Sequence, residues 1–482
     1  MPITDVRTRS EVVVGSLWRP SALGAVGALG VALTTSRIGS VPRPPGYRWW
    51  LSVSSGRYEV AHVLFYASVS LLIVGWLGVG VHARRGQLSV AGAWRILLLW
   101  GVPLVLGPPI FSRDLYSYIA QGQLVRHGLN PYLVAPRALG SGPLFASIAR
   151  VWRDTPSPYG PLFVAITHVG AVLGGGSLIH QVLIFRGFEL IGVGLLMWSL
   201  PAVARRVGTD PGVALWLGVL SPLALFSAVS SAHNDTLMLG LMMTALAASL
   251  HGARRWALVL FALGATIKLP ALAGVVFIAG AQLRASEPTA RARLLAEAVA
   301  IPAAVIIAVT TAAGLGWTWL SPSALQIPTQ LRVLTTPVVS VGYVIAAAAH
   351  ALGLAVSSSA VVSSVQHLSE LAALVLVGGL VVRSRPSNVV RLLGLALLIV
   401  ALASPTLWPW YLLWGLSVLA TTRAQCSWFL VAIGAGAMLL VGPGGTPMIG
   451  GDGYYVSGPL VLASLVWYIG RRPWREVFEG PT

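Results

Sequence analysis

Asp114 is a carboxylate in a position where it can act as a general base. It occurs in the stretch Phe111-Ser-Arg-Asp-Leu-Tyr-Ser-Tyr-Ile-Ala-Gln-Gly122, directly after an apolar segment. We expect Ser112 to cap a short surface helix and Arg113 to keep the neighbouring carboxylate ionised. An ionised carboxylate can accept a proton from a hydroxyl group, whereas an Arg–Asp pair that only trims a helix end has no chemical role. Position alone does not separate these two interpretations.

Three consecutive polar residues, His233-Asn234-Asp235, lie between two long apolar segments. Asn and Asp are ordinary helix caps, but capping does not require a histidine as well. Three hydrogen-bonding side chains at a membrane boundary therefore favour a site for a polyol or a phosphate over capping alone.

Lys268 is the single lysine among 32 lysine and arginine residues, and Pro270 follows it closely. A cation at a membrane boundary can snorkel to the interface, but arginine does so equally well. A compact ammonium group suits a phosphate at headgroup depth. The sequence therefore favours a phosphate-binding role for Lys268.

Further side chains are candidates for the same site. Arg186 and Glu189 are spaced i,i+3 and can neutralise each other within the membrane, and Arg186 can also reach a lipid phosphate. Proline-rich boundaries with aromatic residues lie at 157–161 and 404–411, as is typical of interfacial anchors. With Asp114 as the catalytic candidate, the substrate-binding candidates are Arg113, Tyr116, Tyr159, Arg186, His233, Asn234, Asp235, Lys268, Arg332 and Trp410.

The composition places these residues in an integral membrane protein. Charged residues make up 10% of the 482 residues and hydrophobic residues 56%, with a mean hydropathy of +0.79. A soluble protein carries about 25% charged residues. The single cysteine, Cys426, excludes an internal disulfide, and neither a metal-binding nor a nucleotide-binding motif is present, so we predict no cofactor. The net charge is +18, but the sequence contains no dense run of basic residues interleaved with aromatic ones. We therefore attribute the charge to membrane topology and predict no nucleic-acid partner.

Many apolar segments approach the length of about 20 residues that crosses a bilayer. Fourteen are expected to span: 20–36, 59–81, 96–111, 184–203, 212–231, 235–252, 256–268, 270–284, 295–316, 366–383, 389–405, 408–421, 425–441 and 457–470. Two others, 161–175 and 338–354, are expected to be half-inserted or interfacial, because only then do the arginine-rich loops share the cytoplasmic face. Both termini then lie inside, without a cleavable signal peptide. We predict one all-α polytopic membrane domain over residues 1–482, with its longest external loop at 112–160.

The order of these motifs resembles the GT-C superfamily of polyprenyl-phosphate-sugar-dependent glycosyltransferases. Within it, the chain looks like the actinobacterial α-(1→6)-mannopyranosyltransferases that build the lipomannan backbone. The residues that carry this resemblance are the stretch that begins at Phe111, Gly128-Leu-Asn-Pro-Tyr132, Pro158-Tyr-Gly-Pro-Leu162, His233-Asn-Asp235 and Lys268. They occur in order between about residues 96 and 410.

The resemblance implies a GT-C fold at the plasma membrane, a polyprenyl-phosphate-mannose donor, a lipid-anchored mannan acceptor and a reaction at the external face. Asp114 would deprotonate the acceptor 6-hydroxyl, which attacks the anomeric carbon with inversion. Lys268 would hold the departing phosphate with help from Arg186 or Arg332. Tyr116 stands where the second aspartate of a D-x-D metal motif would be, so a metal-free reaction is expected, with a divalent cation left open.

Two other functions fit the sequence. A secondary transporter or lipid flippase is also long, polytopic and basic, but such proteins usually show internal repeats and polar residues near the bilayer midplane. Here the polar groups concentrate at one membrane face, which favours an enzyme. A GT-C transferase with another donor or linkage, arabinosyl or α-(1→2)-mannosyl, is not separated by the sequence.

Overall fold

The structure is a computed structural model that describes residues 6–42, 57–322, 324 and 336–446 of the chain. Within these residues the regular secondary structure is entirely helical, without strands. This confirms the prediction of an all-α protein.

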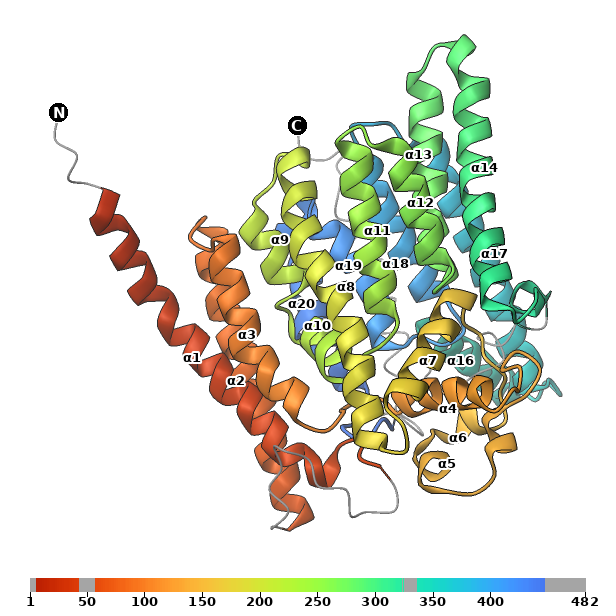
Figure 1. Cartoon of the computed structure of the whole chain (residues 1–482), viewed down its shortest axis with the longest axis horizontal. Coiled ribbons are helices and arrows are strands. Elements are labelled where there is room, and N and C mark those ends of the chain that lie inside the picture. The colour runs from red at the N-terminus through yellow and green to blue at the C-terminus, as the bar shows by residue number, and fades with distance from the viewer. Residues whose placement is uncertain (1–5, 43–56, 323, 325–335, 447–482) are drawn as a thin grey trace.

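The helices pack into one assembly in which the chain runs back and forth many times (Figure 1). The first half contains α1 (Val6–Ile38), α2 (Tyr58–Arg84), α3 (Val90–Leu106), α4 (Asp114–Arg126), η1 (Pro136–Leu139), α5 (Pro143–Ser147), α6 (Arg150–Arg153), α7 (Pro161–Leu173), α8 (Leu178–Val207), α9 (Pro211–Gly218), α10 (Pro222–Ala224), the π-helix η2 (Leu225–Ser230) and α11 (Asp235–Leu250). The second half contains α12 (Arg254–Ala265), η3 (Leu269–Ala271), α13 (Leu272–Ala285), α14 (Pro288–Ala313), η4 (Thr318–Leu320), α16 (Pro337–Ala351), α17 (Ser358–Arg383), α18 (Val389–Ala403), η5 (Pro409–Tyr411), α19 (Leu412–Leu419), η6 (Arg423–Cys426), α20 (Trp428–Gly436) and η7 (Ala437–Leu440).

Five helices in the described part of the chain are long and apolar enough to cross a membrane. They are Leu17–Ile38 within α1, α2, α8, α14 and α17. Two more pieces, Pro211–Gly218 and Pro222–Ser230, together make one candidate span bent by 49°. Pro222 opens the second piece because a proline at the first helical position loses no intrahelical hydrogen bond. The predicted total of fourteen spans stays a prediction, since the remaining apolar helices are shorter.

The two segments expected to be half-inserted do form short helices. The helix α7 has 13 residues and α16 has 15. At about 1.5 Å per residue these helices are shorter than the roughly 30 Å of a hydrocarbon core. Helices in predicted full spans, such as α13 with 14 residues and α18 with 15, are no longer, so partial insertion of α7 and α16 stays a prediction. The predicted span 457–470 lies outside the described residues.

The surface of α17 suits contact with lipid. Leu368, Leu371 and Leu374 are 58–70% exposed, which forms an apolar face with no protein cover among the described residues. Large exposed apolar surfaces mark contact with another protein or with a membrane. Together with the long apolar helices, this supports a membrane protein.

The segment 112–160 folds into α4, η1, α5 and α6 at one end of the molecule (Figure 1). The turn between α13 and α14, which carries an arginine-rich sequence, lies at the opposite end. The helix α4 lies across the end formed by the segment 112–160 and packs against α7. The first residue of α4 is therefore held within a layer of side chains.

The helices α8 and α11 approach each other closely beside the same region. A Cβ atom on Gly192 would lie 2.6 Å from the carbonyl oxygen of Thr236, and one on Gly240 would lie 2.7 Å from the carbonyl oxygen of Gly192. Small residues at helix interfaces in membrane proteins permit such contact. This contact positions the first turn of α11, where Asp235 lies.

Candidate active site

Asp114 is the first residue of α4, and only 6% of it is exposed. Its backbone N–H donates to the Ser112 hydroxyl at 3.1 Å, and the indole N–H of Trp152 donates to its Oδ1 at 2.8 Å. Burial raises the pKa of Asp114 to about 6, while the Trp152 hydrogen bond and the charge of Lys268 limit the rise. A carboxylate with this pKa is ionised at neutral pH and can still take up a proton.

Asp235 is the first residue of α11 and is fully buried. The Nζ of Lys268 donates to both of its carboxylate oxygens, at 2.8 and 2.9 Å. The indole N–H of Trp414 donates to Oδ1 at 2.6 Å. This second carboxylate is therefore neutralised by a cation and fixed by a third donor.

His233 lies in the turn between η2 and α11 and faces Asp114. Its Nε2 is 3.8 Å from Oδ2 of Asp114 and has no hydrogen-bond partner among the described residues. Burial lowers the pKa of His233 to about 3, so the imidazole is neutral. We assign its proton to Nδ1, because Nδ1 lies 3.2 Å from the Ser227 carbonyl oxygen. The Nε2 that faces Asp114 is then an acceptor.

Asn234 presents a second buried polar atom without a partner in the described part of the structure. Its Nδ2 has no hydrogen bond there, while its Oδ1 accepts from the Tyr118 hydroxyl at 3.5 Å. The ring of Tyr118 packs edge-on against Tyr159, with ring centroids 5.3 Å apart. Buried polar atoms in proteins are nearly always paired, so these two atoms, on neighbouring residues of which His233 faces Asp114, are candidates for contact with a ligand.

Aromatic residues of η5 and α19 form one side of the site. Trp410 is 2% exposed and stacks on His233 at 3.8 Å between ring centroids. The ammonium of Lys268 lies 4.3 Å from the Tyr411 ring centroid and 5.3 Å from that of Trp414. Because Trp410 stacks on His233, it can hold the imidazole in place, and that face of the indole is not available to a sugar ring.

Arg186 and Glu189 lie beneath the site on α8, and both are buried. The Arg186 guanidinium donates to the carbonyl oxygens of Val105, Gly107 and Ser230, the last two at 2.7 Å. The Glu189 carboxylate accepts from the backbone N–H of Leu237 at 2.9 Å. Arg186 therefore holds the segment that precedes Asp114, and Glu189 holds the first turn of the helix that begins at Asp235.

Two predicted residues beside Asp114 make structural contacts. Arg113 donates to the carbonyl oxygens of Val41 and Ser147, and the Tyr116 hydroxyl donates to the carbonyl oxygen of Ser40. The expectation that Arg113 keeps Asp114 ionised stays a prediction. The guanidinium binds backbone carbonyls, and burial dominates the pKa of the carboxylate. Arg332 lies outside the described residues.

Sequence reasoning missed the two tryptophans that hold the carboxylates. Trp414 lies one helical turn from Tyr411, so helical spacing could have placed it with the aromatic cluster. Trp152 is 38 residues from Asp114, and no local pattern connects them. Among the described residues, no group of three or more His, Cys, Asp or Glu side chains could hold a metal ion.

The described part of the chain is thus a helical membrane protein with two buried carboxylates and, on His233 and Asn234, two buried polar atoms that find no partner among the described residues. Comparison with known proteins connects this arrangement to a family. A family model described as "Alpha-(1->6)-mannopyranosyltransferase, N-terminal domain" matches residues 20–284, and one described as "MptB C-terminal domain" matches residues 338–471.

Curated relatives agree with these matches. A Mycolicibacterium smegmatis protein named "Probable alpha-(1->6)-mannopyranosyltransferase" is 31% identical, over 97% of this chain and 91% of the relative. The alpha-(1->6)-mannopyranosyltransferase A of Mycobacterium tuberculosis is 29% identical over 90% of this chain and 87% of its own, and that of Corynebacterium glutamicum is 26% identical over 85% and 88%. No solved structure matches.

The chain belongs to the actinobacterial α-(1→6)-mannopyranosyltransferase family, and it is a membrane mannosyltransferase. The family resemblance predicted from the motifs at 111–122, 158–162 and 233–235 is confirmed.

Proposed function

We propose that the chain transfers mannose from polyprenyl-phosphate-mannose to a lipid-anchored mannan, with formation of an α-(1→6) linkage. In this proposal it is a GT-C enzyme with about 14 transmembrane helices and an active site at the external face of the plasma membrane. The family membership supports the transferase class, and the finer features rest on the site's chemistry.

The observation that carries the proposal is a pair of buried atoms, on the adjacent residues His233 and Asn234, that lack partners among the described residues. The first of them lies 3.8 Å from a carboxylate oxygen of Asp114. Nε2 of His233 and Nδ2 of Asn234 provide one acceptor and one donor in a buried position. A sugar hydroxyl is both a donor and an acceptor, so it can satisfy such groups. If the cluster had only a structural role, both atoms would stay without a hydrogen bond, at a cost of about 1–3 kcal/mol of stability each.

The chemistry requires one base and one stabilised leaving group. Asp114 takes the proton of the acceptor 6-hydroxyl as this oxygen bonds to the anomeric carbon of mannose. The bond between that carbon and the phosphate oxygen breaks, and its electron pair leaves with the polyprenyl phosphate. Attack from the side opposite the phosphate inverts a β-linked donor to an α-mannoside.

Lys268 supports the leaving phosphate while it remains paired with Asp235. Two N–H groups of its ammonium are directed to Asp235, and an ammonium carries three donors. The third donor can bind a phosphate oxygen, and 14% of the side chain is exposed. Electrostatic stabilisation of a developing anion often contributes more to catalysis than any other single effect.

Sidedness is supported by the arginine-rich turns at the end opposite α4–α6 (Figure 1), because basic loops face the cytoplasm. Leu133 and Arg255 are exposed positions at the two ends. In a Cys426→Ser background, Leu133→Cys should react with an impermeant thiol reagent on intact cells, and Arg255→Cys should react only after permeabilisation. The reverse pattern would contradict an external site.

Product analysis tests the activity directly. Purified protein with labelled polyprenyl-phosphate-mannose and a short α-mannoside acceptor should form an α-(1→6)-linked product. Transfer only from an arabinosyl donor, or formation of an α-(1→2) linkage, would assign another GT-C specificity. Movement of lipid across vesicles without any transfer would favour a flippase.

A further inference from the structure

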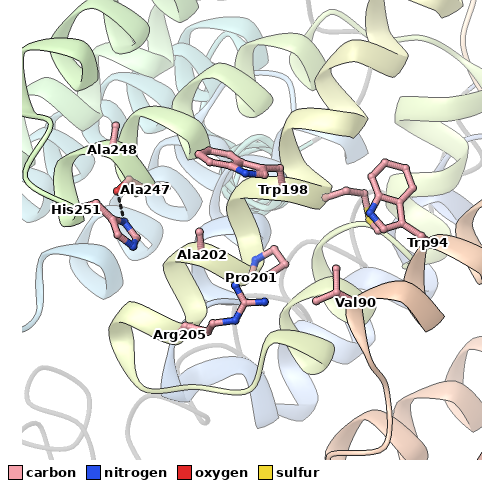
Figure 2. A pocket seen from close by; sticks show the side chains of 10 residues that line it. Val90, Trp94, Trp198, Pro201, Ala202, Arg205, Ala247, Ala248 and His251 are labelled. Atoms are coloured by element: carbon pink, nitrogen blue, oxygen red, sulfur yellow. Dashed lines mark hydrogen bonds between the residues drawn. The ribbon is translucent and has the colours of Figure 1, made fainter.

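A hollow with a volume of about 460 Å³ lies between the start of α3, the last turns of α8 and the end of α11 (Figure 2). Arg205 lies 19 residues beyond Arg186 on α8, which corresponds to about 28 Å along a helix. His251 is similarly 16 residues beyond Asp235, or about 24 Å. The hollow is therefore near the end of the spans opposite the candidate active site.

One cation in this hollow has no partner within the described part of the chain. The Arg205 side chain makes no hydrogen bond, ion pair or aromatic contact with the described residues, whereas the adjacent Arg206 donates from Nε to the Leu250 carbonyl oxygen at 3.0 Å. His251 holds its Nδ1 at 2.8 Å from the Ala247 carbonyl oxygen, as Figure 2 shows. If the proton on Nδ1 is donated to that carbonyl oxygen, the unprotonated Nε2 can accept a hydrogen bond from a ligand in the hollow.

The walls around these polar groups are mainly apolar. Trp198 is 60% exposed and Trp94 is 39% exposed, and both indoles line the hollow. Trp94 is near the start of α3, where a tryptophan sits at headgroup depth, whereas Trp198 lies nine residues, or about 13 Å, before the end of α8. A small soluble anion would not need the apolar walls, and an apolar ligand would not need an arginine that the described residues leave unpaired.

We propose that this hollow binds one anionic phospholipid from the leaflet that faces the arginine-rich loops. The lipid phosphate contacts Arg205, a hydroxyl of the headgroup donates to Nε2 of His251, and an acyl chain lies along Trp198 and Trp94. Basic pockets between transmembrane helices bind acidic headgroups by charge complementarity. The proposal is independent of the transfer reaction, because the hollow shares no residue with the candidate active site.

Lipid-dependent unfolding of the full chain in detergent tests this proposal. Phosphatidylglycerol should raise the unfolding midpoint of the wild type, and phosphatidylcholine at the same concentration should not. The Arg205→Gln variant should bind phosphatidylglycerol about tenfold more weakly, because it loses a charge-assisted hydrogen bond. Arg206→Gln is the matched control, since it removes the neighbouring charge whose Nε binds the Leu250 carbonyl.

Trp198→Ala provides a second variant that leaves the charge unchanged, and it should also weaken the phosphatidylglycerol response. Inorganic phosphate and glycerol 3-phosphate should not reproduce the lipid's shift. Equal responses of the Arg205→Gln and Arg206→Gln variants would overturn the proposal. A shift from inorganic phosphate as large as that from phosphatidylglycerol would also overturn it, because the ligand would then be a soluble anion.

Discussion

The two carboxylates of the candidate site lie in similar surroundings but differ in the partner that faces them. Asp114 and Asp235 each begin a helix, each is buried, and each accepts a hydrogen bond from a tryptophan indole. Asp235 also accepts two hydrogen bonds from the ammonium of Lys268, whereas the side chain facing Asp114 is the neutral imidazole of His233.

This difference separates two tasks. A cation in direct contact holds a carboxylate in its charged form, which suits an electrostatic and structural role. A buried carboxylate without such a contact has a raised pKa and binds a proton more readily, as a general base must. We therefore propose proton transfer for Asp114 and charge placement for the Asp235–Lys268 pair, and each role can be tested.

The largest effect is expected from Asp114→Asn. This variant keeps an oxygen that can accept from Trp152 but removes the proton acceptor, so turnover should fall by about two to four orders of magnitude. The measurement is the rate of labelled mannose transfer at saturating donor. Asp154→Asn is the control, because Asp154 is an exposed residue of the same segment. Near-normal turnover in the Asp114 variant would move the base elsewhere, with Asp235 as the next candidate.

A smaller loss is expected from Lys268→Ala, about ten- to a hundredfold, because a charge-assisted hydrogen bond to the donor phosphate disappears. Lys268→Arg should recover only part of the activity, since the guanidinium is larger and planar. The alanine variant also leaves Asp235 without its cation and should lower the unfolding midpoint, because breaking a buried pair costs about 3–5 kcal/mol.

Donor dependence separates the two effects of Lys268. In the double variant Lys268→Ala, Asp235→Asn, the unpaired charge is gone, so stability should return while the donor response stays weak. Full activity of Lys268→Arg together with an unchanged donor response of Lys268→Ala would contradict a phosphate-binding role.

The pH dependence should follow Asp114. The base acts in its ionised form, so turnover should fall about tenfold per pH unit below about 6. The stability effect has the opposite sign. Because the folded pKa is raised above the ordinary 3.8, protonation favours the folded state, and this contribution is lost as pH rises through about 6.

Asp114→Asn removes this titration and supplies the control. The free energy of unfolding of the variant minus that of the wild type should increase as pH rises from about 4 to about 7. The same stability difference at both ends of this pH range would contradict a raised pKa at this position.

The smallest effect is expected from exchange of the tryptophans. Trp152→Phe removes the hydrogen bond that lowers the pKa of Asp114, so the acidic limb of the pH–rate profile should move upward. Trp414→Phe acts on Asp235 and should leave that limb in place. An equal shift in both variants would show that the two carboxylates titrate as one coupled unit.

Much of the candidate site could be predicted from residue types and their order. Asp114, His233, Asn234 and Lys268 are all recognisable in the sequence as polar groups at helix ends, and the structure brings them together. Their roles relative to one another could not be predicted. The sequence predicts that Lys268 binds a phosphate, but it does not predict that the ammonium also binds Asp235, which is 33 residues away in the chain.

The sequence by itself determined that this is a helical membrane protein with its polar residues at the ends of apolar segments. Apolar length and hydropathy are local properties, so they can be read along the chain. Only the tertiary structure decided which donor meets which carboxylate. Trp152 and Asp114 are 38 residues apart, and Trp414 and Asp235 are 179 apart. Burial and hydrogen bonding between such distant segments depend on helix packing, and it is this packing that makes the two aspartates different.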